Sequence, residues 1–283
     1  MFEFHADRKR YFDIQIWNAE KYVLPFIEEK YPIKLGMRVL EIGAGEGGVL
    51  KAFVNKGCIG VGVELEEQRV VNGSLWLKDD IENGKIAFFV KDIYDADITD
   101  LGGKFDIIVL KDVIEHIHDQ QKLIEKLKSF LNPGGVIYFG FPPWQMPFGG
   151  HQQMCESKLS KVPYFHLLPN SLYKMVFRLF KEHPNTIEIL IEVKETCLSI
   201  ERFEKIVKNS GYKIIDKKHY HINPIYEWKF ELKPKVQNSF VSKIPFIRDF
   251  VTTCVYYLIK PAHNSIENGY KLSAIKNVPV NND

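Results

Sequence analysis

A glycine-rich segment flanked by carboxylates carries the clearest chemical signal in the sequence. Val39-Leu40-Glu41-Ile42 is an apolar run of the kind that forms a buried strand, and Gly43-Ala44-Gly45-Glu46-Gly47 follows it. Glycines allow the chain to turn sharply and let a ligand approach the backbone at the end of the strand. Glu64 ends the next apolar run, 21 residues after Gly43, where an acid would accept hydrogen bonds from ribose hydroxyls. The pattern predicts a nucleoside-binding loop.

The charge of this loop narrows the choice of nucleoside. A dinucleotide carries a pyrophosphate, which prefers neutral or basic surroundings. The loop instead carries Glu41 and Glu46, its nearest downstream cation is Lys51, and residues 36–118 contain 15 acidic against 9 basic residues. S-adenosylmethionine has no phosphate, and its ammonium and sulfonium groups are both positive. The loop is therefore expected to bind S-adenosylmethionine and to repel NAD.

A second set of polar residues follows the fourth apolar run. Asp112, Glu115 and His116 have the i, i+3, i+4 spacing that places side chains on one face of a helical turn. With a later histidine such as His151 they could bind Mg²⁺ or Zn²⁺, or they could contact substrate without a metal, and we expect no metal. His151 follows Gly149-Gly150 and lies either at the mouth of the pocket or on a surface loop. We take His151 and His116 as the candidate catalytic residues.

These residues need elements that bring them together, and the sequence alternates strands with helices. Short apolar, β-branched runs predict strands, and the periodic segments between them predict helices. The predicted strands span 38–42, 59–65, 86–90, 105–110, 136–141, 212–222 and 254–259. The predicted helices span 47–56, 66–78, 118–131, 171–181 and 200–209. This alternation is typical of an α/β, doubly wound, mostly parallel sheet with helices on both faces.

The chain divides into an N-terminal helical segment at 1–35, a main domain at 36–261 and a polar tail at 262–283. Within the main domain, residues 142–198 interrupt the alternation and are rich in aromatic side chains. Because this insertion follows the fifth predicted strand, it starts at the carboxyl edge of the sheet, where ligands of such folds bind. We expect the insertion to select the substrate.

Five segments, in order over residues 36–141, resemble the motifs of class I S-adenosylmethionine-dependent methyltransferases. They are Glu41-x-Gly43-x-Gly45-x-Gly47, Val61-Gly62-Val63-Glu64, Val90-Lys91-Asp92-Ile93, Phe105 to His116, and Leu131-Asn132-Pro133-Gly134-Gly135. The resemblance implies a Rossmann-like, seven-stranded sheet whose last strand is antiparallel. It also implies that S-adenosylmethionine contacts Glu41, Gly43, Ala44, Gly45, Gly47, Glu64, Leu65, Asp92, Ile93 and Lys111.

The expected function is transfer of the methyl group of S-adenosylmethionine to an oxygen, nitrogen or carbon atom of an unidentified small acceptor. Aromatic residues flank the expected pocket, which favours an apolar, aromatic or lipid-like acceptor. They are Phe139, Phe141, Trp144, Phe148, Tyr164 and Phe165. Two alternatives stay open: an NAD(P)-dependent oxidoreductase, which Glu41 and Glu46 disfavour, and a non-catalytic S-adenosylmethionine-binding module.

Three further features concern partners and location. Residues 171–181 place Lys174, Arg178 and Lys181 on one helix face and apolar side chains on another, which fits a lid helix or docking on an anionic membrane. The sequence contains no dense Lys/Arg run, so nucleic acid is not an expected partner. Widely spaced cysteines and an N-terminus without an apolar leader predict a cytoplasmic protein. The oligomeric state stays open.

Overall fold

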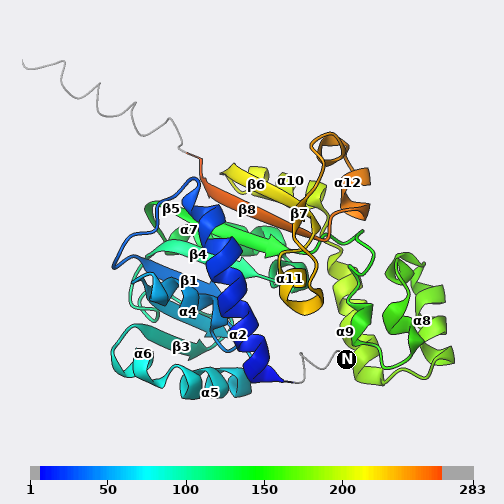
Figure 1. The fold of residues 1–283 in the computed structure, drawn as a ribbon, viewed down its shortest axis with the longest axis horizontal. Helices are drawn as coiled ribbons and strands as arrows, with labels where there is room; N and C mark the ends of the chain where they lie inside the picture. Colours follow the sequence, from blue (N-terminus) through cyan, green and yellow to red (C-terminus); the bar gives the residue numbers. More distant parts are fainter. Residues whose placement is uncertain (1–6, 263–283) are drawn as a thin grey trace, which may run out of the picture.

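A computed structural model of the protein describes residues 7–262, which contain one sheet of eight strands (Figure 1). The strands are β1 Arg38–Ile42, β2 Ile59–Glu64, β3 Ile86–Val90, β4 Phe105–Lys111, β5 Leu131–Phe141, β6 Tyr212–Ile222, β7 Lys235–Val236 and β8 Cys254–Pro261. Their order is β3-β2-β1-β4-β5-β8-β6-β7. β1 to β5 pair in parallel, and β8 runs antiparallel to both β5 and β6. The predicted fold class is confirmed.

The sheet differs from the prediction in two details. An eighth strand, β7, pairs antiparallel with the end of β6 and forms one edge of the sheet, while β3 forms the other. Two residues are too few for any periodic pattern, so the sequence contains no signal for β7. β5 begins at Leu131 instead of residue 136, because Leu131 pairs with Phe105 ahead of an irregularity in the register.

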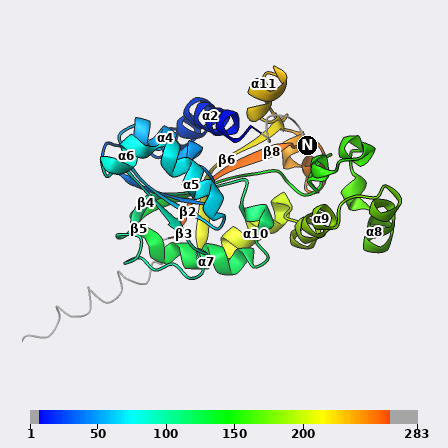
Figure 2. The ribbon, with the colours of Figure 1, turned by 90° about the horizontal axis from the view of Figure 1, so that it is seen from below.

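Helices cover both faces of the sheet (Figure 2). One face carries α2 Arg8–Asn18, the π-helical turn η1 Ala19–Val23, α3 Leu24–Glu28, α4 Gly48–Asn55, α5 Glu67–Trp76 and α6 Lys78–Glu82. The other face carries α7 Gln120–Phe130 and α10 Ile200–Asn209. Successive strand residues point to opposite faces, so Leu40 of β1 packs in the core under α7, while Val39 packs in the core under α4.

The insertion between β5 and β6 lies beside the carboxyl ends of the strands (Figure 1). It contains the 3₁₀ turns η3 Gln152–Met154, η4 Lys158–Lys161 and η5 Phe165–Leu167, and the helices α8 Asn170–Leu179 and α9 Pro184–Thr196. A small apolar core of its own holds it together, formed by Cys155, Leu159, Phe165, Tyr173, Phe177 and Leu190. The sequence does not predict α9. Only Leu190, Val193 and Thr196 of its side chains are buried, and its other apolar side chains do not mark one inward face.

Three short helical elements follow β6, namely α11 Ile225–Phe230, the 3₁₀ turn η6 Val241–Lys243 and α12 Ile247–Phe250. Across residues 7–262, every helix is too short or too polar to cross a lipid bilayer. Apart from Ala262, the predicted polar tail lies outside the described residues.

Candidate active site

The loop after β1 turns through three glycines, Gly43, Gly45 and Gly47, whose φ angles are +66°, +55° and +81°. A Cβ on Gly43 would lie 2.4 Å from Val113 Cγ2, and one on Gly47 would lie 2.5 Å from Phe88 Cζ. A Cβ on Gly45 would meet nothing closer than 4.0 Å. Gly43 and Gly47 are therefore needed for close packing. A Cβ on the buried Gly45 would meet only the end of the Arg69 side chain, so a ligand has room to approach the backbone there.

Glu64, the last residue of β2, holds this loop in place through hydrogen bonds to its backbone. Its Oε2 accepts a hydrogen bond from the Gly45 N–H at 2.7 Å. Its Oε1 accepts bonds from the N–H groups of Leu65 and Glu66 at 2.9 and 3.0 Å. The Leu65 side chain is exposed, but the Glu64 carboxylate is buried. Glu64 thus places its carboxylate directly beside the backbone of Gly45.

The two other acids of the loop are engaged within the protein. Glu41 is buried and accepts a hydrogen bond at 2.9 Å from the Leu50 N–H in the first turn of α4. Burial raises the pKa of Glu41 to about 8, although the bond from Leu50 opposes the shift. Glu46 is buried and pairs with Arg8 of α2, with 2.6 Å between Arg8 Nε and Glu46 Oε1. The loop is therefore less acidic than its sequence suggests.

The remaining predicted cofactor residues lie at the carboxyl ends of β3 and β4. Because β3, β2, β1 and β4 are successive neighbours, Asp92, the glycine loop and Lys111 form one row along the sheet edge. Asp92 Oδ1 accepts a hydrogen bond from the Tyr94 N–H at 2.8 Å. The Ile93 side chain belongs to the core, so only its backbone is available to a ligand. Lys111 is buried, and its Nζ lies 2.6 Å from Asp112 Oδ2.

Helix α2 lies against the start of α4, next to the glycine loop. A Cβ on Gly48 would lie 2.7 Å from Gln15 Cβ and 2.8 Å from the Phe12 carbonyl oxygen, so the two helices meet closely at a glycine. Gln15 Nε2 donates to the Tyr11 hydroxyl at 2.8 Å. Together with Arg8, these residues bring the N-terminal segment to the site, a role that no motif within residues 1–35 indicates.

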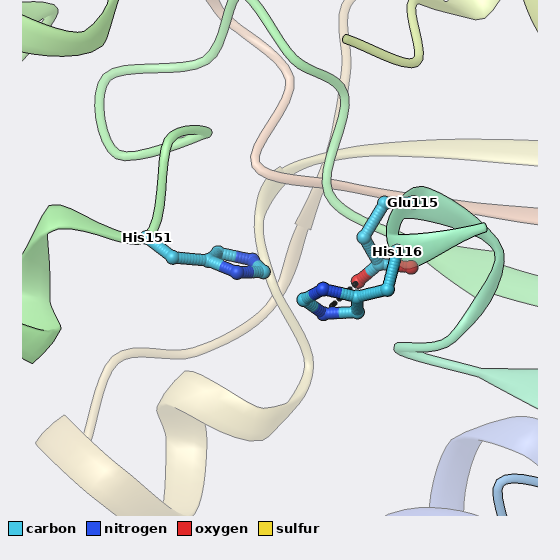
Figure 3. Close-up of side chains that lie close together, drawn as sticks. All are labelled: Glu115, His116 and His151. Carbon is cyan, nitrogen blue, oxygen red and sulfur yellow. Dashed lines mark ion pairs between the residues drawn. The ribbon is translucent and has the colours of Figure 1, made fainter. Parts of the chain in front are cut away.

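Beyond β4, one acid and two histidines form a cluster (Figure 3). Glu115 and His116 come from the 3₁₀ turn η2, Ile114–His116, and His151 comes from the insertion. Each residue has one potential ligand atom within 4.8 Å of those of the other two. His116 Nε2 lies 4.0 Å from Glu115 Oε1, and the rings of His116 and His151 are 4.9 Å apart between centroids. The structure brings the two candidate catalytic histidines together.

Asp112 does not join this cluster as the i, i+3, i+4 pattern suggested. The chain after β4 forms a single 3₁₀ turn, and Asp112 adopts a φ of +56°. Its carboxylate pairs with Lys111 instead. The charge of Lys111 holds the pKa of Asp112 below its ordinary value, even though burial acts in the opposite direction.

Burial controls the protonation of the cluster. Glu115 is only 5% exposed, and neither of its carboxylate oxygens has a hydrogen-bond partner. Burial raises the pKa of Glu115 well above its ordinary value, and the charge of Asp112 adds to the shift. Partial burial also lowers the pKa of both histidines, that of His151 to about 3. Both imidazoles are therefore neutral at neutral pH, and each has a nitrogen lone pair to offer to a ligand.

The loop that carries His151 is closely packed. His151 has a φ of +55°, and the two glycines before it have no room for side chains. A Cβ on Gly149 would lie 2.2 Å from the Trp144 carbonyl oxygen, and one on Gly150 would lie 2.1 Å from His166 Cβ. Close packing therefore accounts for both glycines and gives His151 a defined position.

The structure corrects the expected aromatic lining of the pocket. Phe139 and Phe141 are fully buried in the main core, where their rings lie 5.0 and 4.9 Å from that of Phe203. Phe165 belongs to the core of the insertion, whereas Tyr164 is 39% exposed. An aromatic residue at a strand end looks the same in sequence whether it faces the core or a ligand, so the spacing could not separate the two cases.

A glycine loop after β1, acids ending β2 and β3, and a sheet closed by an antiparallel strand define a Rossmann-like nucleoside-binding domain. The comparison with known families narrows this class. Residues 18–163 match the family described as "Methyltransferase domain", and the chain belongs to that family.

Individual relatives agree with this assignment. The "Ubiquinone biosynthesis O-methyltransferase" of Coxiella burnetii is 29% identical over 116 residues, which cover 41% of this chain and 47% of the relative. The chain thus spans about half the length of the curated relatives it matches. A solved S-adenosylmethionine-dependent methyltransferase from Clostridium acetobutylicum has a TM-score of 0.55 at 15% identity, over 88% of this chain and 92% of that one.

Magnesium protoporphyrin IX methyltransferase from Synechocystis, solved with bound S-adenosylhomocysteine, has a TM-score of 0.52 at 14% identity, over 89% of this chain and 84% of that one. At these identities the two solved structures establish the fold. The Rossmann-like sheet implied by the sequence motifs is confirmed.

Proposed function

We propose that the protein transfers the methyl group of S-adenosylmethionine to a small acceptor. The observation that carries the proposal is the row of groups at the carboxyl ends of β1 to β4, where the backbone of Gly45 has room for a ligand beside the Glu64 carboxylate. In this row Glu64 receives the ribose hydroxyls, and Asp92 on the next strand receives the adenine amino group. Membership of the methyltransferase family supports the same reading.

The reaction places a nucleophilic atom of the acceptor in line with the bond between sulfur and the methyl carbon. A new bond to the methyl carbon forms as the bond to sulfur breaks, and the sulfonium becomes a neutral thioether. Most of the acceleration comes from alignment and exclusion of water. An imidazole with a pKa near 3 is a weak base. We therefore propose that His151, together with His116, orients the acceptor and does not deprotonate it.

The acceptor that we propose is small, apolar or aromatic, and lipid-like. The insertion supports this choice because it brings an apolar core and the partly exposed Tyr164 to the edge of the sheet where His151 lies. The name of the Coxiella relative supports an oxygen atom as the site of methylation. The four cysteines are all unpaired, which supports a reducing location such as the cytoplasm.

Helix α8 supports delivery of the acceptor from a lipid surface. Tyr173 and Phe177 point inward and are fully buried, so α8 is anchored to the insertion by one face. Its outward apolar side chains are Leu172, Met175 and Leu179, with Lys174 and Arg178 exposed beside them. Exposed apolar residues flanked by cations are typical of a helix that lies on an anionic membrane.

Calorimetric titration with S-adenosylmethionine, S-adenosylhomocysteine and NAD tests the cofactor. We expect both sulfur compounds to bind one per chain and NAD to give no signal. Binding of NAD alone would support the oxidoreductase and refute the proposal. Transfer is then measured with methyl-labelled S-adenosylmethionine and a panel of hydroxylated aromatic lipids. Cofactor binding with no label transferred to any acceptor of this class would favour the non-catalytic binding module.

A further inference from the structure

The cluster of Glu115, His116 and His151 offers three potential metal ligands, more groups than are needed to orient an acceptor. Glu115 is the key residue, because its carboxylate is buried and both oxygens lack a hydrogen-bond partner. Burying a polar side chain without a hydrogen-bond partner is unfavourable for folding in general. A buried polar group left in this state calls for a functional explanation.

We propose that Glu115, His116 and His151 bind one divalent ion of the zinc class and leave at least one coordination position open. The three side chains converge from two directions, with Glu115 and His116 on the turn after β4 and His151 on the insertion (Figure 3). Two imidazole nitrogens and one carboxylate oxygen form the donor set of open zinc sites, where a fourth position is left for water or substrate.

The donor set also selects among metals. Mg²⁺ and Ca²⁺ prefer all-oxygen surroundings, so two imidazoles disfavour them. Zinc accepts nitrogen and oxygen donors at about 2.0–2.2 Å, which places two ligands of one tetrahedral ion roughly 3.3 Å apart. The potential ligand atoms of the cluster lie within 4.8 Å of one another, so a contraction of up to about 1.5 Å completes the site. The His116 side chain is 43% exposed, so it is free to change its rotamer.

A contact behind the cluster fixes the turn that presents Glu115. Thr196, the last residue of α9, is buried and donates its hydroxyl hydrogen bond to the Glu115 carbonyl oxygen at 2.5 Å. Removing a group that orients a ligating residue typically weakens metal binding by about 10–100-fold. The insertion therefore contributes to the site twice, through His151 as a ligand and through Thr196 as a support.

An ion at this position sharpens the acceptor class, and this step rests on the proposed function. The open position takes a hydroxyl oxygen of the acceptor and lowers the pKa of that hydroxyl, so its proton passes to solvent water. The oxyanion then attacks the methyl carbon of the sulfonium, an oxygen–carbon bond forms, and the sulfur–carbon bond breaks. The ion thus selects oxygen over the nitrogen or carbon acceptors that the sequence left open.

Metal binding is tested without any acceptor. Metal-free protein is titrated with Zn²⁺ and with Mg²⁺ by calorimetry, and with Co²⁺ by visible absorption, which reports low-symmetry coordination by protein ligands. We expect one Zn²⁺ and one Co²⁺ per chain and no Mg²⁺. Glu115→Gln and His151→Gln should each weaken Zn²⁺ binding more than ~100-fold, because loss of a ligand exceeds the 10–100-fold effect of a supporting residue.

Two further variants keep the test decisive. His116→Gln changes a partly exposed side chain and should fold like wild type, as a thermal melt of the metal-free protein checks. His118→Ala is the matched control, because His118 lies 3.5 Å from Glu192 in an exposed pair and offers an alternative surface site. Zinc binding that survives all three cluster substitutions, or that His118→Ala abolishes, overturns the proposal, as does a site that takes Mg²⁺ in preference.

Affinity for S-adenosylhomocysteine separates this proposal from the proposed function. The cluster variants should bind that compound as wild type does, since its contacts lie along β1 to β4. If the protein binds zinc through the cluster but does not bind S-adenosylhomocysteine, the metal site stands and the methyltransferase assignment fails. If the reverse is found, the methyltransferase stands and the metal site fails.

Discussion

The substitution Glu64→Ala tests two roles of Glu64: holding the glycine loop in place and binding the cofactor. The carboxylate accepts three backbone hydrogen bonds, and the one from Gly45 is buried. An unsatisfied buried N–H costs about 1–3 kcal/mol, whereas the N–H groups of Leu65 and Glu66 can turn to water. We therefore expect the free energy of unfolding to fall by about 1–3 kcal/mol.

The loss of cofactor affinity should be larger than the loss of stability. Two ribose hydroxyls bonded to a carboxylate contribute ~1.5–3 kcal/mol each, and 1.4 kcal/mol is a tenfold change in affinity. Calorimetry should show S-adenosylhomocysteine binding weakened at least tenfold, with urea unfolding measured on the same preparation. Glu67→Ala, an exposed acid three residues further on, is the control and should change neither quantity. Unchanged affinity in Glu64→Ala would place the ribose elsewhere and refute the assigned role.

Three other predictions test separate parts of the structure. The pKa of Glu41 in the folded protein lies near 8, above its ordinary value, so the free energy of unfolding should fall as the pH rises from about 5 to 8. Glu41→Gln should abolish this pH dependence in urea unfolding. Gly45→Ala should weaken cofactor binding by calorimetry because its methyl group enters the open side of the loop, whereas Gly36→Ala, with a similar φ of +79° away from the loop, should only reduce stability. Leu179→Asp should reduce co-sedimentation with phosphatidylglycerol vesicles, and Leu35→Asp, at an exposed leucine outside α8, should not.

The row of cofactor residues could be predicted because it depends on local patterns. Glu64 ends one apolar run, Asp92 follows another by two residues, and parallel strands that are neighbours end at the same edge of a sheet. Asp106 of β4 has a structural role, because it accepts hydrogen bonds from the Arg38 N–H and the Asn132 side chain.

The rest of the site depends on contacts between distant segments. Arg8 meets Glu46 across 38 positions, and nothing near either residue indicates the pair. The sequence allows His151 to join His116, but only the fold of the insertion shows that their rings meet. The isolation of the Glu115 carboxylate is a property of packing around it, which a charged residue in a sequence motif does not reveal.

The position of β3 at the edge of the sheet has a consequence for handling the protein. Its sequence, Ile86-Ala87-Phe88-Phe89-Val90, has the length and composition of segments that stack into intermolecular cross-β structure. An edge strand presents unpaired backbone groups to other chains, and Val90 is 49% exposed. Lys85 and Lys91 flank the segment, and such charges oppose the addition of a second copy. Replacing both lysines by apolar residues should therefore lower the yield of soluble protein.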